Sequence, residues 1–179
     1  NGQPQMASHL QRKILPRLVP NKGRIPIIMI AGGLPASWDI RERLASALLD
    51  SGIRMGWAGP GVVSVGHEQL EILANNSSFG CRALLADTRV DAIVWHARKH
   101  PSTFDAFPVD RLDGMLLPRN ASNTASPPDN AKSEHRELPA ALPLAFDIFA
   151  DGTKAHAELT PDEFCEKIRQ LIRRNINKI

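Results

Sequence analysis

The segment Ile25–Asp39, with the sequence IPIIMIAGGLPASWD, constrains the fold most, because an apolar run, two glycines and a helix start follow one another directly. A continuous apolar run is typical of a strand in a sheet that is covered on both faces. At a turn from such a strand into a helix, backbone N–H groups converge with the positive end of the helix dipole, which favours a bound anion. The segment therefore predicts an α/β sheet with a ligand-binding turn at its edge.

That turn lacks the lysine with which a P-loop holds a nucleotide. A P-loop places Lys beside the β- and γ-phosphates and Ser or Thr beside Mg²⁺. Here Gly32 and Gly33 are followed by Leu-Pro-Ala-Ser, and Pro35 removes one backbone donor. We interpret the turn as a remnant phosphate loop in which Gly32, Gly33, Ser37 and Arg41 are the candidate cofactor-binding residues.

Composition narrows the class of protein. The 179 residues are 42% hydrophobic, which suits one domain with a sizeable core, and no apolar run is long enough to cross a membrane. The formal charge of +3 comes partly from basic clusters at residues 11–17 and 167–178, which contain no aromatic residue for stacking on bases. Two cysteines cannot form a disulfide framework. We therefore expect a cytoplasmic protein that binds neither membrane nor nucleic acid.

Strands alternate with helical segments, which predicts βαβ units, and so a three-layer α/β sandwich with a mainly parallel sheet. We expect residues 1–22 to be a basic lead-in or linker, and residues 23–179 to be one domain with a flexible Pro/Ser/Asn-rich loop over 118–139. Asp39 with Glu42, and Thr160 with Glu163, have the spacing of helix capping boxes. The strands are expected at 25–30, 53–57, 91–96, 113–117 and 142–149, and the helices from residue 40 to Gly52, at 67–75, at 79–86 and from Pro161 onward.

Four local segments give the chain a family resemblance: GRIPI (Gly23–Ile27), SGIRMG (Ser51–Gly56), ALLADTRVDAIVWHAR (Ala83–Arg98) and FPVDRLDGMLL (Phe107–Leu117). From about residue 14 to residue 122 the chain resembles the Mur-ligase-type ATP-dependent amide ligases, particularly the C-terminal half of cyanophycin synthetases. The resemblance implies a P-loop-like central domain, ATP and Mg²⁺ as cofactors, and a companion ATP-grasp domain upstream.

The positions that carry catalysis in that family depart from its pattern. The phosphate-loop lysine falls on Ala36 or Ser37, the glutamate that holds Mg²⁺ falls on Trp95, and the expected Asp-His pair falls near residues 119–123, where neither residue occurs. Phosphoryl transfer depends on positive charge and a divalent ion beside the phosphates. We therefore expect no catalytic residues, no metal ligands and no cofactor in this chain.

His96 and Arg98 follow the end of a predicted strand, the edge at which open α/β sheets bind ligands. We expect them to line a crevice with the turn from Gly32 to Ser37. The spacing of His67 and Glu68 is interpreted as capping of a short helix.

The resulting hypothesis is a catalytically inactive structural, interaction or regulatory module of a cyanophycin-synthetase-like protein. Its partners would be other domains or subunits of a larger protein, and a homo-oligomer is compatible with the sequence. One alternative is an ATP- and Mg²⁺-dependent amide ligase in which Arg41 replaces the lysine. A second alternative is a sensor of a small anion or metabolite at the glycine turn.

Overall fold

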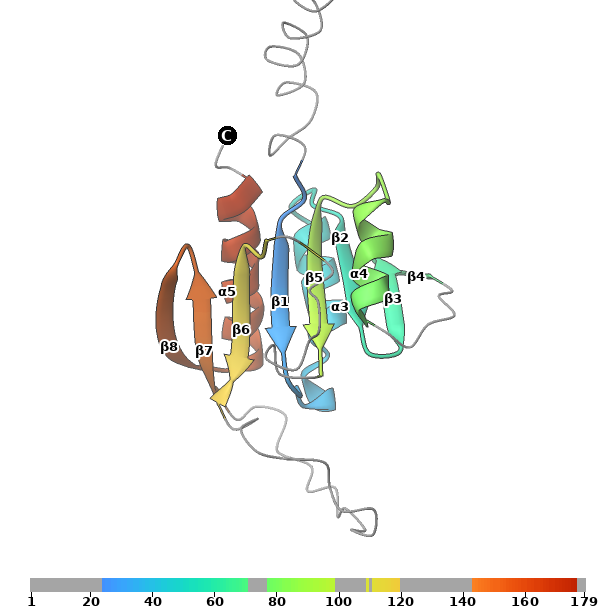
Figure 1. Cartoon of the computed structure of the whole chain (residues 1–179). Coiled ribbons are helices and arrows are strands. Elements are labelled where there is room, and N and C mark those ends of the chain that lie inside the picture. The colour runs from blue at the N-terminus through green and yellow to red at the C-terminus, as the bar shows by residue number, and fades with distance from the viewer. Residues whose placement is uncertain (1–23, 71–76, 99–108, 110, 120–142, 177–179) are drawn as a thin grey trace, which may run out of the picture.

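The structure is a computed structural model, and it describes residues 24–70, 77–98, 109, 111–119 and 143–176. In these residues, eight strands form one sheet with the order β4-β3-β2-β5-β1-β6-β7-β8 (Figure 1). The strands are β1 (Ile27–Ala31), β2 (Met55–Gly59), β3 (Val62–Val65), β4 (Glu68–Leu70), β5 (Ala92–Ala97), β6 (Gly114–Pro118), β7 (Leu144–Ala150) and β8 (Thr153–Leu159). The helices are the 3₁₀ turn η2 (Ala36–Trp38), α3 (Ile40–Leu49), α4 (Ser77–Leu85) and α5 (Pro161–Ile176).

The centre of the sheet is parallel and both sides are antiparallel. The parallel pairs are β2 with β5, β5 with β1, and β1 with β6. The antiparallel pairs are β2 with β3, β3 with β4, β6 with β7, and β7 with β8. The general α/β class is therefore confirmed, but the mainly parallel sheet of a three-layer P-loop sandwich is wrong. The physical reason is that short turns join β2 to β3, β3 to β4 and β7 to β8 as hairpins, and that β7 runs antiparallel to β6.

Helices cover both faces of the central strands (Figure 1). One face packs against α3 and α5, where the rings of Trp38, Phe146 and Phe164 lie with centroids 4.8–6.2 Å apart. The other face packs against α4, with Trp95 and Cys81 fully buried. All five residues of β1 are buried, which explains its continuous apolar sequence. In α5, the buried face is an apolar stripe made of Phe164, Ile168, Leu171 and Ile172.

The two predicted capping boxes have opposite outcomes. At α5, the Thr160 backbone N–H donates to Glu163 Oε2 at 2.9 Å, and the Glu163 N–H donates to Thr160 Oγ1 at 3.4 Å, so this box is confirmed. At α3, Asp39 adopts a left-handed conformation with φ of 45° and makes no side-chain capping bond. The prediction there was wrong, because the preceding 3₁₀ turn fixes the entry of the chain into α3 and turns the carboxylate away.

Three strands were missed, and each follows a glycine turn. The glycine-rich segment 60–66 contains β3 between Gly61 and Gly66, which have φ of 76° and 57°. The helix expected over 67–75 was wrong at its start, where Glu68–Leu70 forms β4, and residues 71–76 lie outside the described residues. β8 follows the two-residue turn Asp151-Gly152, whose φ values of 51° and 75° are those of a hairpin turn.

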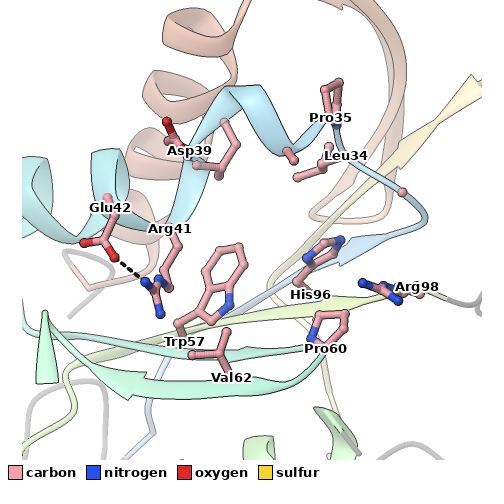
Figure 2. Close-up of a pocket in the computed structure, with 13 residues that line it drawn as sticks. Leu34, Pro35, Asp39, Arg41, Glu42, Trp57, Pro60, Val62, His96 and Arg98 are labelled. Atoms are coloured by element: carbon pink, nitrogen blue, oxygen red, sulfur yellow. Dashed lines mark hydrogen bonds and ion pairs between the residues drawn. The ribbon is translucent and has the colours of Figure 1, made fainter. Parts of the chain in front are cut away.

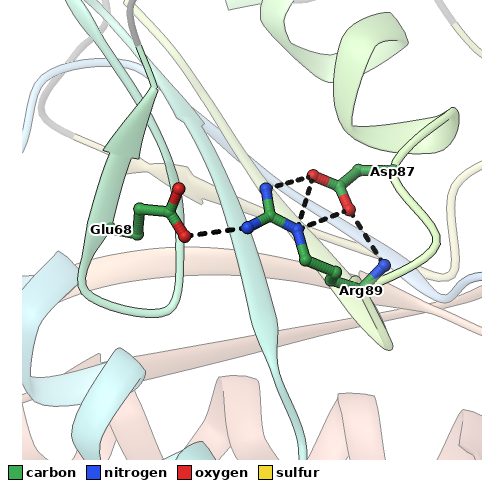
Figure 3. A network of polar contacts seen from close by, with 3 residues as sticks. All are labelled: Glu68, Asp87 and Arg89. Carbon is green, nitrogen blue, oxygen red and sulfur yellow. Dashed lines mark hydrogen bonds and ion pairs between the residues drawn. The ribbon is translucent and has the colours of Figure 1, made fainter.

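An ion-pair network holds the short edge strand β4 to the loop that follows α4 (Figure 3). The Arg89 guanidinium donates to Glu68 Oε2 at 2.8 Å and to Asp87 Oδ2 at 2.8 Å. Arg89 is 42% exposed, so we expect this network to position β4 with little contribution to overall stability.

The lead-in over 1–22 and nearly all of the loop over 118–139 lie outside the described residues, apart from Pro118 in β6 and Arg119. No helix within the part of the chain that the structure describes is long and apolar enough to cross a membrane.

Candidate functional site

A cavity of about 530 Å³ opens at the carboxyl ends of β1, β2 and β5, on the face of the sheet that carries α3 (Figure 2). Three parts of the fold form its wall: the turn after β1, the first turn of α3, and the ends of β2 and β5 with the start of β3. The residues that line it are Gly33, Leu34, Pro35, Ala36, Asp39, Ile40, Arg41, Glu42, Trp57, Pro60, Val62, His96 and Arg98.

His96 has a fixed orientation in this wall. Its Nε2 lies 2.9 Å from the Gly32 carbonyl oxygen, and because a carbonyl only accepts, Nε2 carries the proton. Burial lowers the pKa of His96, so the ring is neutral at pH 7 and its Nδ1 is an acceptor. The Trp57 ring meets His96 edge to face, with centroids 5.7 Å apart (Figure 2). The two rings together give this part of the cavity an aromatic wall.

Arg41 lies in the wall, but its charge is already engaged. Its guanidinium contacts the carboxylate of Glu42 (Figure 2). The second oxygen of that carboxylate lies 3.2 Å from His67 Nδ1. The hydrogen bond from His67, followed by the contacts with Arg41, lowers the pKa of Glu42 below its ordinary value. Glu42 therefore stays ionised at neutral pH and neutralises Arg41 at the helix start.

The charges that line the cavity balance. Asp39 and Glu42 oppose Arg41 and Arg98, while His96 is neutral. A nucleoside triphosphate is strongly anionic, and its binding sites compensate that charge with Lys, Arg and a divalent ion. This wall offers no such excess of positive charge.

Of the described positions that the family resemblance assigns to catalysis, Ala36 alone lines the cavity. Ala36 and Ser37 are exposed in the 3₁₀ turn, and Ser37 does not line the cavity. Trp95 is fully buried on the opposite face of the sheet, where its Nε1 donates to Ser77 Oγ at 3.1 Å. Arg119 is the described residue of the segment in which the family's Asp-His pair would fall. It directly follows β6, and its Nε lies 2.7 Å from Asp147 Oδ1 of β7.

The residues present therefore do not fit Mg²⁺ and ATP as a phosphate loop would hold them. Among the described residues, no group of three or more His, Cys, Asp or Glu side chains is placed to hold a metal ion. The described wall also contains no Ser, Thr, Cys or Lys side chain that could act as a nucleophile. Its chemistry is that of a binding site: aromatic and aliphatic surface beside the exposed guanidinium of Arg98 and the acceptor nitrogen of His96.

The structure brings together four residues that the sequence singled out, since Gly33, Arg41, His96 and Arg98 all line the cavity. Gly32 lies behind the wall and acts through its carbonyl on His96. Sequence reasoning did not place Trp57 at the site, although its position at the end of a strand on the same edge was a usable signal.

Comparisons with known proteins identify no relative. No family model matches the chain, and no curated protein matches it significantly.

Proposed function

We propose that the chain is a catalytically inactive Mur-ligase-like domain that binds a small ligand in the cavity and serves a larger protein as a regulatory or interaction module. The observation that carries the proposal is the cavity at the carboxyl ends of β1, β2 and β5, whose charges balance and whose wall contains no lysine. Open α/β sheets bind their ligands at this edge. A site that keeps the position but has lost the phosphate-binding charge suits a ligand other than a nucleoside triphosphate.

The placement of the resembling segments supports the proposal. They fall on the start of β1, the turn into β2, α4 with β5, and β6, and these four strands are the parallel centre of the sheet. The antiparallel β7 and β8 come from the part of the chain beyond the resemblance, and the antiparallel β3 and β4 lie between two of the resembling segments. A Mur-ligase-like centre with altered catalytic positions accounts for this division.

The wall favours a ligand of low net charge. Trp57, Leu34 and Val62 offer apolar surface, and Arg98 and His96 offer one cationic donor and one neutral acceptor. A monoanion or a zwitterion with an apolar part matches these groups, whereas a polyphosphate meets the carboxylates of Asp39 and Glu42. Among the hypotheses from sequence, this supports the metabolite sensor over the amide ligase.

A thermal-shift screen tests the proposal, because a ligand that binds only the folded state raises the apparent stability by about 2.7 kcal/mol at a hundredfold excess over Kd. The screen compares aliphatic and aromatic carboxylates, amino acids, inorganic phosphate and Mg-ATP. We expect a shift with a monoanion or zwitterion, and none with Mg-ATP.

Two variants then locate the binding site. Arg98→Ala removes the exposed cation of the cavity, and we expect about tenfold or greater loss of affinity for the ligand found. Arg82→Ala is the matched control, because it removes the same charge from the exposed side of α4, on the opposite face of the sheet, and should leave affinity unchanged. A rise in melting temperature with Mg-ATP, accompanied by phosphate release, would favour the ligase. A melting temperature that no compound of the screen changes would refute ligand binding.

A further inference from the structure

One edge of the sheet is long and pairs with no other described strand. β8 is the last strand in the sheet order and pairs with β7 through all seven of its residues, so its outer side faces away from the described sheet (Figure 1). The opposite edge is β4, which has only three residues. An edge strand presents a row of backbone N–H and C=O groups that can pair with another strand.

The hairpin geometry determines which backbone groups of β8 point outward. Asp151 and Gly152 form a two-residue turn, so the closing pair Ala150–Thr153 is of the hydrogen-bonded type. Hydrogen-bonded and non-hydrogen-bonded pairs alternate along an antiparallel ladder. The outward backbone groups of β8 are therefore those of Lys154, His156 and Glu158.

We propose that β8 joins two copies of this chain by antiparallel edge-to-edge pairing centred on His156. In that register, Lys154 lies opposite Glu158 of the partner subunit and Glu158 lies opposite Lys154 of the partner subunit. The pairing thus forms two cross-strand pairs of opposite charge, which stabilise antiparallel strands. The strand itself indicates that the partner is a second copy of this chain. When the sequence K-A-H-A-E is laid antiparallel to itself, each Lys lies opposite a Glu.

Other registers fit less well. Centring the pairing on Ala155 places Lys154 opposite His156, and centring it on Ala157 places Glu158 opposite His156, so both lose the Lys–Glu pairs. A centre between two residues places outward backbone groups opposite inward ones and cannot form the ladder. On the face toward α5, the chosen register places Ala155 opposite Ala157, two small side chains.

Contacts within the subunit hold Lys154 in place for this pairing. Its Nζ lies 2.9 Å from Asp147 Oδ2 and 5.3 Å from the centre of the Phe149 ring. A lysine ammonium has three donors, so it can contact Asp147 and a carboxylate of the partner subunit together. Glu158 is exposed and lies opposite Ala145 of β7, so its charge can be reversed without breaking the contacts of Lys154.

Light scattering coupled to size-exclusion chromatography, with a dilution series by analytical ultracentrifugation, tests the proposal on the 179-residue chain. The measurement is made at pH 8. We expect a mass of twice 19.6 kDa for the wild type. A wild type that stays monomeric at its highest soluble concentration would overturn the proposal.

Charge-swap variants test the register. Glu158→Lys sets like charges opposite each other twice and should weaken dimerisation about tenfold or more. The double variant Lys154→Glu/Glu158→Lys restores both opposite-charge pairs between the subunits but loses the contact of residue 154 with Asp147, so it should dimerise more tightly than Glu158→Lys and more weakly than the wild type. Asp50→Lys is the control, because it makes the same reversal of charge at the exposed end of α3, and it should leave the mass of the dimer in solution unchanged. A dimer that Glu158→Lys leaves intact, or a double variant that dimerises no more tightly than Glu158→Lys while circular dichroism shows a folded chain, would also overturn it.

Discussion

Trp95→Glu restores a carboxylate at the position that the resemblance assigns to Mg²⁺ binding, and we predict that it unfolds the domain instead of creating a metal site. Trp95 is fully buried in the apolar layer between the sheet and α4, on the face opposite the cavity. Losing a buried Trp side chain costs about 3–5 kcal/mol. A carboxylate placed there without a partner adds further desolvation cost. The total approaches the roughly 5–15 kcal/mol by which domains are stable.

Two comparison variants separate this reasoning from a general intolerance to substitution. His96→Glu introduces the same carboxylate one residue later, in the half-buried cavity wall near Arg98. It loses the hydrogen bond to Gly32, which is worth about 1 kcal/mol, and incurs only part of the desolvation cost. Trp95→Phe keeps an aromatic ring and loses the Nε1 bond to Ser77, a similar cost.

Urea unfolding followed by circular dichroism gives the free energy of unfolding for each variant. We expect Trp95→Glu to be largely unfolded without denaturant, and the other two to lose no more than about 2 kcal/mol. A folded Trp95→Glu domain that Mg²⁺ stabilises would refute the placement of this residue and the inactive assignment together.

Three further predictions concern stability. Thr160→Ala removes the confirmed capping box of α5 and should cost about 1 kcal/mol, measured as a lower urea midpoint. Gly80→Ala should cost about 1–3 kcal/mol, because the added Cβ would lie 2.5 Å from Val63 Cγ2, whereas Gly33→Ala meets nothing within 4 Å and should be nearly neutral. For Asp147, hydrogen bonds and ion pairs with surrounding cations hold the pKa of the carboxyl well below its ordinary value, so its stabilisation is present above about pH 4 and is lost as the pH falls through the folded-state pKa. The stability difference between wild type and Asp147→Asn, followed by thermal melts from pH 7 downward, should therefore shrink with acidification, and a constant difference would contradict it.

The centre of the fold could be predicted from the sequence because its signals are local and strong. The apolar run beginning at Ile25 marks a strand buried on both faces, and the Thr160–Glu163 spacing marks the start of α5. In α3, by contrast, two leucines follow each other near the helix end, and the sequence does not tell which one is buried. Leu48 is fully buried and Leu49 is 47% exposed, because the next residue of a helix is rotated by about 100°.

The sides of the sheet could not be predicted in the same way. β8 alternates Lys, His and Glu with alanines, so it lacks the apolar signal of a central strand, although Asp-Gly before it is a hairpin turn. β3 has only four residues between two glycines, which made the segment resemble a loop. The parallel assignment failed because the hairpin strands β3, β4 and β8 were missed and because β7 pairs antiparallel with β6.

The residues of the candidate site that directly follow a central strand were predicted, and those that a hairpin brings to the cavity were missed. His96 and Arg98 follow β5 directly, so the edge rule places them. Trp57 enters the site with the β2–β3 hairpin. The pairing of Arg41 could not be foreseen, because it depends on Glu42 being held by His67, a contact between segments 25 residues apart.

Isothermal titration of Mg-ATP into the chain tests most directly whether the cavity binds a nucleotide. We predict no saturable heat with Mg-ATP for the wild type and for Arg41→Ala alike, because Glu42 already neutralises that guanidinium. Saturable binding in the micromolar range that Arg41→Ala abolishes and Arg82→Ala preserves would contradict the inactive assignment and show that an arginine has replaced the missing lysine.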